Sequence, residues 1–83
     1  MKNTSHKTLD KLSNDVNHDV RLAVAQNVKT HPDLLQHLAS SPSVYIRAAV
    51  GSNPNSYKHV LKKLSTDQNP FVSDAAKNNI NLK

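Results

Sequence analysis

Two stretches of the chain carry nearly the same sequence, "RLAVAQNVKT" at residues 21–30 and "RAAVGSNPNS" at residues 47–56. Both begin with Arg, have Ala and Val at their third and fourth positions, and place Asn seventh. The second stretch begins 26 residues after the first. A fixed spacing of this size is typical of proteins built from stacked repeats, in which each repeat is one supersecondary unit.

The same period extends over the whole chain. Six sets of matching residues are spaced by 26 positions without a gap. These sets are Thr4, Thr30 and Ser56; Leu9, Leu35 and Leu61; Leu12, Leu38 and Leu64; Val20, Ile46 and Val72; Ala23, Ala49 and Ala75; and Asn27, Asn53 and Asn79. We therefore predict a single repeat domain over residues 1–83, with units at residues 4–29, 30–55 and 56–81.

Each unit is predicted to form two short helices. The first helix is expected to begin at a hydroxyl residue that accepts a hydrogen bond from its first turn, namely Thr4, Thr30 or Ser56. The second helix is expected to begin at Asn17, Ser43 or Asn69. Because Asn tolerates the left-handed backbone conformation at helix C-termini, the second helix is predicted to end at Asn27, Asn53 or Asn79. Its buried stripe is predicted to be Val20, Ala23 and Val24, repeated as Ile46, Ala49 and Val50.

Stacking of these helix pairs is the way so short a chain forms a core. A helix of about ten residues spans only about 15 Å and is marginal alone. Neighbouring pairs bury one another's Leu and Val side chains, and small residues such as Gly51 are expected to let the helices approach closely. The fold class we predict is all-α, a short α-solenoid of three stacked helical hairpins.

The two end units differ from the middle one. The predicted first helix, residues 5–13, surrounds two leucines with polar side chains, and the last helix, residues 72–79, places Lys77 where Ala25 and Gly51 stand in the other units. Polar end helices are typical of a capped solenoid. The open alternative is contact between end units of two molecules, so we expect a monomer or a weak homodimer through an end repeat.

Composition narrows the class of protein. The 83 residues include 11 Lys and Arg against six acidic residues, for a net charge of +5. The absence of cysteine excludes disulfides, thiolate metal sites and a catalytic thiol. No apolar run approaches the ~20 residues that span a bilayer. We therefore expect a cytoplasmic protein without membrane contact, whose basic charge favours acidic partners.

The stretch "VRLAVAQNVKTHPDLLQHLASSPS", residues 20–43, resembles the leucine-rich repeat variant family. Asp15 lies six residues before Arg21, a spacing found in the related HEAT repeats. The resemblance implies a right-handed stack of short helices that serves as a binding scaffold. Some relatives carry a cysteine-bound iron–sulfur cluster and some HEAT-like relatives are DNA glycosylases, but this chain has no cysteine and no glycosylase motif.

Catalytic and metal-binding patterns are weak. With one glycine the chain has no phosphate-binding loop, and no Ser, His and Asp set has a recognisable context. Asp33, His37 and His59 would share one face of neighbouring units and could bind zinc in principle, but surface histidines explain the pattern better. We therefore predict a non-enzymatic protein without a metal or other cofactor.

The leading functional hypothesis is a module that binds another macromolecule, and specifically a scaffold for a protein partner. The expected surface is the row of second helices, where small residues would leave room for the side chains of a partner. Its predicted residues are Arg21, Leu22, Ala25, Arg47, Ala48 and Gly51.

Two alternatives remain open. One is weak, electrostatic binding of nucleic acid such as DNA through Lys11, Lys58, Lys62 and Lys63, with Arg21 and Arg47 as further phosphate contacts. Against it, the two arginines could instead form ion pairs with Asp15 and Asp67. The other alternative is a self-assembling structural protein.

Overall fold

The computed structural model describes residues 18–82, and this part of the chain is all-helical. Its first helix covers residues 18–26. The remaining helices are α2 (Pro32–Leu38), α3 (Val44–Ser52), α4 (Lys58–Leu64) and α5 (Pro70–Leu82). The prediction of an all-α protein is therefore confirmed for these residues. None of the described helices combines the length and apolar character needed to cross a membrane.

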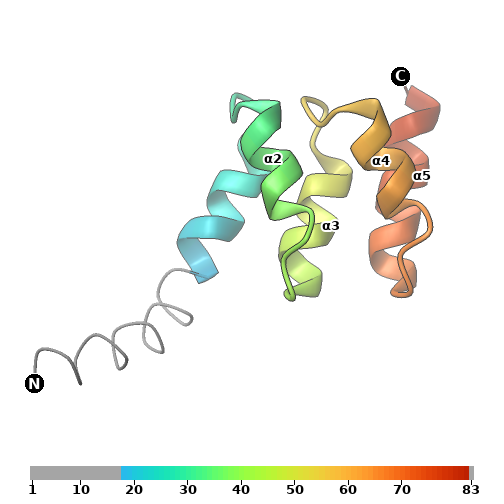
Figure 1. Ribbon diagram of the computed structural model, residues 1–83, viewed down its shortest axis with the longest axis horizontal. Coiled ribbons are helices and arrows are strands. Elements are labelled where there is room, and N and C mark those ends of the chain that lie inside the picture. Colours follow the sequence, from blue (N-terminus) through green and yellow to red (C-terminus); the bar gives the residue numbers. More distant parts are fainter. Residues whose placement is uncertain (1–17, 83) are drawn as a thin grey trace, which may run out of the picture.

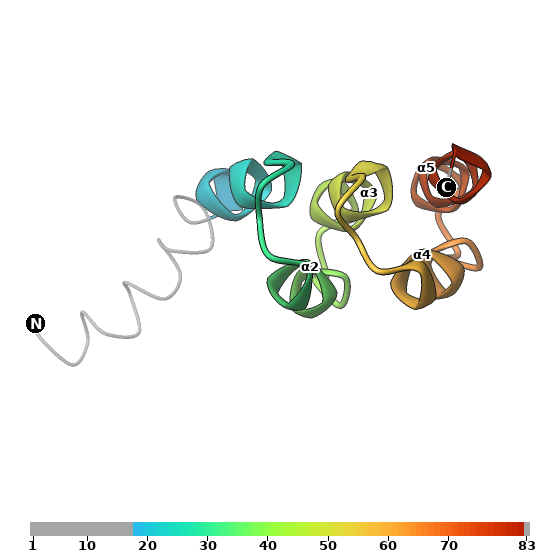
Figure 2. The same cartoon turned by 90° about the horizontal axis from the view of Figure 1, so that it is seen from above.

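The helices form two rows (Figure 1). Figure 2 shows the helix over residues 18–26, α3 and α5 side by side in one row, with α2 and α4 in the other. Along the chain, α2 and α3 form one hairpin and α4 and α5 form the next. The closest packing between elements is that of α3 on α5. The second helices of the predicted units are thus direct neighbours.

The core between the two rows is built from the residues that repeat every 26 positions. Leu35 and Leu61 are fully buried, and so are Ile46, Val50 and Val72. Figure 2 shows that the helices of one row are staggered relative to those of the other, so that α2 faces the space between the first helix and α3. The predicted Leu and Ile/Val positions are therefore core residues in the part of the chain from α2 to α5.

The first helix departs from the predicted stripe. Val20 is 55% exposed, whereas Ile46, at the same position of the next unit, is 1% exposed. Ala23 is exposed as well, and Val24 is half-buried. The prediction of burial is therefore wrong for Val20 and Ala23 within the described structure, because α2 covers only one flank of this helix (Figure 2). Val24 is partly buried and packs against the core.

Two of the predicted helix caps are confirmed. The Ser43 hydroxyl accepts a hydrogen bond from the Ile46 N–H at 3.3 Å, at the start of α3. The side-chain oxygen of Asn69 accepts one from the Phe71 N–H at 2.9 Å, and Pro70 follows as the first residue of α5. Asn17 and the predicted helix over residues 5–13 lie outside the described residues.

The hydroxyl residues of the first helices have another role than the predicted one. Thr30 Oγ1 donates to the carbonyl of Val24 at 2.6 Å, and Ser56 Oγ donates to that of Val50 at 2.7 Å. The tight turns before these residues bring each hydroxyl back beside the last turn of the preceding helix. Because the hydroxyls are engaged there, the prediction that they cap α2 and α4 is wrong; His31 and Tyr57 occupy the cap positions.

The predicted left-handed Asn residues are also absent from the described structure. None of its non-glycine residues has a positive φ, Asn53 is extended with φ −78° and ψ 122°, and Asn79 lies inside α5. The repeated Asn instead joins neighbouring units. Asn53 Nδ2 donates to the carbonyls of Ala25 and Asn27 at 2.8 and 2.9 Å. One unit later, Asn79 Nδ2 donates to the carbonyls of Gly51 and Asn53 at 2.9 and 2.8 Å. The repeat therefore encodes a buried asparagine ladder.

Gly51 has the predicted packing role. A Cβ atom at this position would lie 3.3 Å from the backbone nitrogen of Ala76, in α5. This distance is tighter than an ordinary van der Waals contact, so the missing side chain lets α3 and α5 pack closely.

Candidate binding surfaces

Three residues of the predicted partner surface are not accessible. Ala25 and Ala48 are almost completely buried, and Gly51 is buried against α5. The small side chains at these positions leave room for neighbouring parts of the same molecule and not for a partner. Of the remaining predicted residues, Arg21 is exposed and Leu22 is half-buried.

The row of second helices nevertheless carries an exposed aromatic pair. Tyr45 in α3 and Phe71 in α5 lie 26 residues apart, so they occupy the same position of successive units. Their exposed fractions are 64% and 62%. Sequence analysis missed this pair, although the 26-residue spacing of two aromatic residues could have indicated it.

A shallow hollow of about 330 Å³ lies beside the two rings and is lined by apolar residues of three helices and a loop. Leu22, Val28, Ala49 and Pro54 are among its lining residues. A second hollow, of about 510 Å³, flanks the same rings on the side of His18 and Asn69. We name the surface formed by Leu22, Val28, Tyr45 and Phe71 the aromatic face.

The position of the Tyr45 ring depends on the first helix. The His18 ring meets it edge-on, with ring centroids 6.3 Å apart. His18 Nε2 in turn lies 2.7 Å from the Ser43 hydroxyl, which also caps α3. Together these contacts hold the aromatic side chain in a defined orientation at the surface, which lowers the entropic cost of binding.

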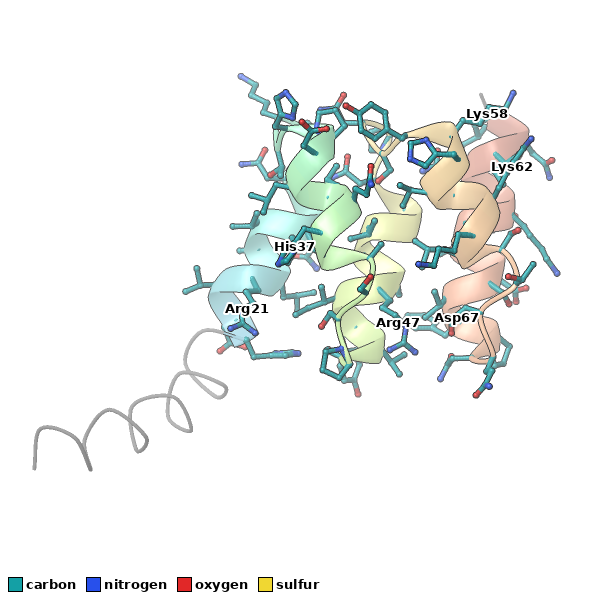
Figure 3. The ribbon with its side chains drawn as sticks, viewed as in Figure 1. Arg21, His37, Arg47, Lys58, Lys62 and Asp67 are labelled. Atoms are coloured by element: carbon teal, nitrogen blue, oxygen red, sulfur yellow. The ribbon has the colours of Figure 1, made fainter. Side chains whose placement is uncertain are left out.

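Arg47 forms a double hydrogen-bonded ion pair with Asp67. Its Nε donates to Asp67 Oδ2 at 2.9 Å and its Nη2 to Oδ1 at 3.3 Å, while Nη1 donates to the carbonyl of Ser41 at 2.9 Å. Figure 3 shows the two side chains pointing toward one another between α3 and the loop that precedes α5. The guanidinium, together with an N–H donated by the Asn69 backbone, lowers the pKa of Asp67. The ion-pair interpretation is confirmed for Arg47, which has one N–H on each of its three nitrogens engaged within the protein.

Arg21 occupies the same position one unit earlier but has different surroundings. Asp67, the partner of Arg47, follows that arginine by 20 residues. The residue 20 positions after Arg21 is Ser41, which has no carboxylate. Within residues 18–82, Arg21 forms no ion pair. Asp15, its other predicted partner, lies outside the described residues.

The predicted basic residues of α4 are all exposed. Lys58, Lys62 and Lys63 make no ion pair with any described residue. Lys58 and Lys62 project from the outer side of α4 (Figure 3), and His37 is exposed at the position of α2 that corresponds to Lys63. Lys11, the remaining lysine predicted to contact nucleic acid, lies outside the described residues.

The side chains considered for zinc have other contacts. The Tyr57 hydroxyl donates to Asp33 Oδ1 at 2.7 Å, and this bond to a carboxylate raises the pKa of Tyr57. His59 lies 3.3 Å from Gln36 Oε1 and stacks on the Tyr57 ring, with centroids 5.2 Å apart. No group of three His, Asp, Glu or Cys residues between 18 and 82 is arranged to hold a metal ion.

Comparisons of the chain with protein-family models, with curated proteins and with solved structures found no match.

Proposed function

We propose that the protein is a non-enzymatic binding module that takes a protein partner on the aromatic face. The observation that carries the proposal is the exposure of Tyr45 and Phe71 at one position of successive units. Large aromatic side chains that are more than half exposed are unusual at a surface without a partner, and they are enriched among residues that dominate binding energy.

The shape of this face supports a protein partner of apolar character. The hollows beside the two rings are shallow and open, and half of the residues that line the one of about 330 Å³ are aliphatic. The one of about 510 Å³ has fewer aliphatic residues in its lining. Neighbouring packed helices lie roughly 8–10 Å apart, so the rings present two anchor points at that spacing. In the first unit, Asp19 stands at the position that Tyr45 has in the second unit. In the third unit, Asp74 stands at the position of Ala48. Both acids are exposed, so each end of the face carries a negative charge. An amphipathic segment with two apolar anchors and flanking basic residues fits these properties.

The proposed architecture is a right-handed stack of three hairpins at residues 4–29, 30–55 and 56–81, similar to leucine-rich repeat variant and HEAT-like proteins. The repeated Leu core, the asparagine ladder and the Arg47–Asp67 pair between α2–α3 and α4–α5 support it. In such a stack equivalent residues form straight rows, which is how the two aromatic side chains come to share one face.

The proposal is tested by comparing three immobilised baits in the same lysate: the wild type, Tyr45→Ala/Phe71→Ala, and Leu82→Ala. The last removes an apolar side chain that is 87% exposed but lies away from the aromatic face. We expect a protein that is retained by the wild type and by Leu82→Ala and lost with the double variant, and that also binds the purified wild type directly. Retention by the double variant, or no enriched protein, would refute the proposal.

A second candidate function is electrostatic binding of nucleic acid, favoured by the three exposed α4 lysines that lack an ion pair among the described residues. Its test is fluorescence anisotropy with random duplex DNA at low and at physiological salt. Binding that weakens steeply with salt and is lost in Lys58→Ala/Lys62→Ala/Lys63→Ala, but not in Tyr45→Ala/Phe71→Ala, would support this function instead. Absence of binding at low salt would exclude it.

A further inference from the structure

An apolar groove lies at the end of the described structure that is farthest from α5. It has a volume of about 480 Å³ between the helix over residues 18–26 and α2. Val20, Val24, Leu34 and Leu38 form its apolar walls. Val20 and Leu34 are 55% and 44% exposed, an unusual state for two neighbouring aliphatic side chains of a repeat core.

One unit later, the corresponding apolar wall is covered. It is formed by the residues 26 positions further on, Ile46, Val50, Val60 and Leu64, and all four are buried. The helix beside them is α2, which contributes Leu35 and Leu38 to the same buried cluster. The residues that follow α2, Ala39 and Ser40, line a hollow of about 490 Å³ beside the Arg47–Asp67 pair.

We propose that residues 5–13 of the same chain occupy the open groove, in the place that α2 occupies one unit later. In this register Leu9 and Leu12 correspond to Leu35 and Leu38. The inference rests on the three-hairpin architecture proposed above but not on the binding function of the aromatic face, because the groove and that face are different surfaces.

The polar residues of the segment also match the groove. Arg47 donates a hydrogen bond to the carbonyl of Ser41. One unit earlier, Arg21 stands at the position of Arg47 and Asp15 at the position of Ser41. Arg21 lies on the rim of the open groove without a carboxylate partner among residues 18–82. Docking of residues 5–13 therefore brings Asp15 close to Arg21, which has no ion-pair partner among the described residues.

The covalent connection favours this segment over a second molecule. The four residues between positions 13 and 18 join the segment to the first described helix, and the corresponding link joins Ala39 to Val44. A segment tethered by so short a link is present at an effective concentration of about millimolar or higher, which exceeds that of a free partner.

The test is methyl NMR of the full-length chain at low concentration. We expect nuclear Overhauser effects (NOEs) from the methyl groups of Leu9 and Leu12 to those of Val20 and Leu34. Leu9→Ala/Leu12→Ala should remove these signals and lower the midpoint of urea denaturation. Lys7→Ala/Lys11→Ala is the matched control, because its positions correspond to the exposed Asp33 and His37, and it should leave the midpoint unchanged.

Mixed samples separate the possible occupants. If the cross-signals appear only between differently labelled molecules, a second copy fills the groove and the proposal is wrong. If they are absent and Leu9→Ala/Leu12→Ala unfolds at the wild-type midpoint, the segment does not dock and the proposal is equally wrong.

Discussion

The helix over residues 18–26 and α3 carry nearly the same sequence but make different contacts. Val20 is largely exposed and Ile46 is buried. Asn27 is exposed, whereas Asn53 bridges to two carbonyls of the preceding unit. The difference lies in the neighbours, since α3 lies between the first helix and α5, whereas the first helix has described neighbours on one side only (Figure 2).

This comparison shows what a repeated residue contributes. A repeated residue has a position that the period defines, but its interaction energy depends on the unit that covers it. Burial of a Val or Leu side chain is worth roughly 1.5–3 kcal/mol, whereas the same side chain left in water contributes little. Stability of the stack is therefore expected to grow with each added neighbour.

The largest expected effect is loss of a leucine from the covered part. Leu35 is fully buried in α2, so Leu35→Ala removes its contacts and leaves a cavity that costs about 2–5 kcal/mol. Leu82→Ala, at an exposed leucine, should cost less than about 0.5 kcal/mol. Urea denaturation followed by circular dichroism measures both, and similar losses would show that Leu35 is not a core residue.

A smaller effect is expected from the Arg47–Asp67 pair, and it depends on pH. The pKa of Asp67 is lowered in the folded protein, so the pair stabilises the fold fully above the unfolded-state pKa of about 4. That contribution is lost as the pH falls through the lower folded-state value. The urea midpoint of the wild type should therefore fall more between about pH 6 and about pH 3 than that of Asp67→Asn. Parallel pH profiles would contradict this role of the pair.

The smallest effect on stability is expected at the aromatic face. Tyr45→Ala/Phe71→Ala removes two exposed rings, so the free energy of unfolding should change by no more than about 1 kcal/mol. Unfolding of the variant in urea checks this expectation. A larger loss would mean that the rings stabilise the stack, and the bait experiment would then need single variants that remain folded.

Sequence reasoning succeeded where an interaction follows from the period alone. The spacing of Leu35 and Leu61 predicted a shared core position, and Gly51 predicted close packing of second helices. The caps at Ser43 and Asn69 were also predictable, because a short polar residue before a helical pattern is a local feature. These statements need no knowledge of the exact path of the turns.

The failures concern polar side chains with more than one possible partner. Thr30 could cap the next helix or bond back to the previous one, and the geometry of the intervening turn decides between them. Asn53 was assigned a backbone role, whereas its side chain links two units. The 26-residue spacing of Tyr45 and Phe71 indicates only that they share a position. Their exposure could not be derived, because helical periodicity alone does not reveal which flanks are covered by neighbours.

The most direct test compares Asn53→Ala with Asn27→Ala, two changes at the same position of successive units. The Asn53 amide donates to two carbonyls in a buried place, so its loss should cost about 1–3 kcal/mol of the free energy of unfolding. Among residues 18–82, the exposed Asn27 side chain accepts only the Lys29 N–H, so Asn27→Ala should cost less than about 0.5 kcal/mol. Unequal losses of this order, measured by urea denaturation, are the predicted result. Equal losses would contradict the claim that a repeated residue stabilises the fold only through the unit that covers it.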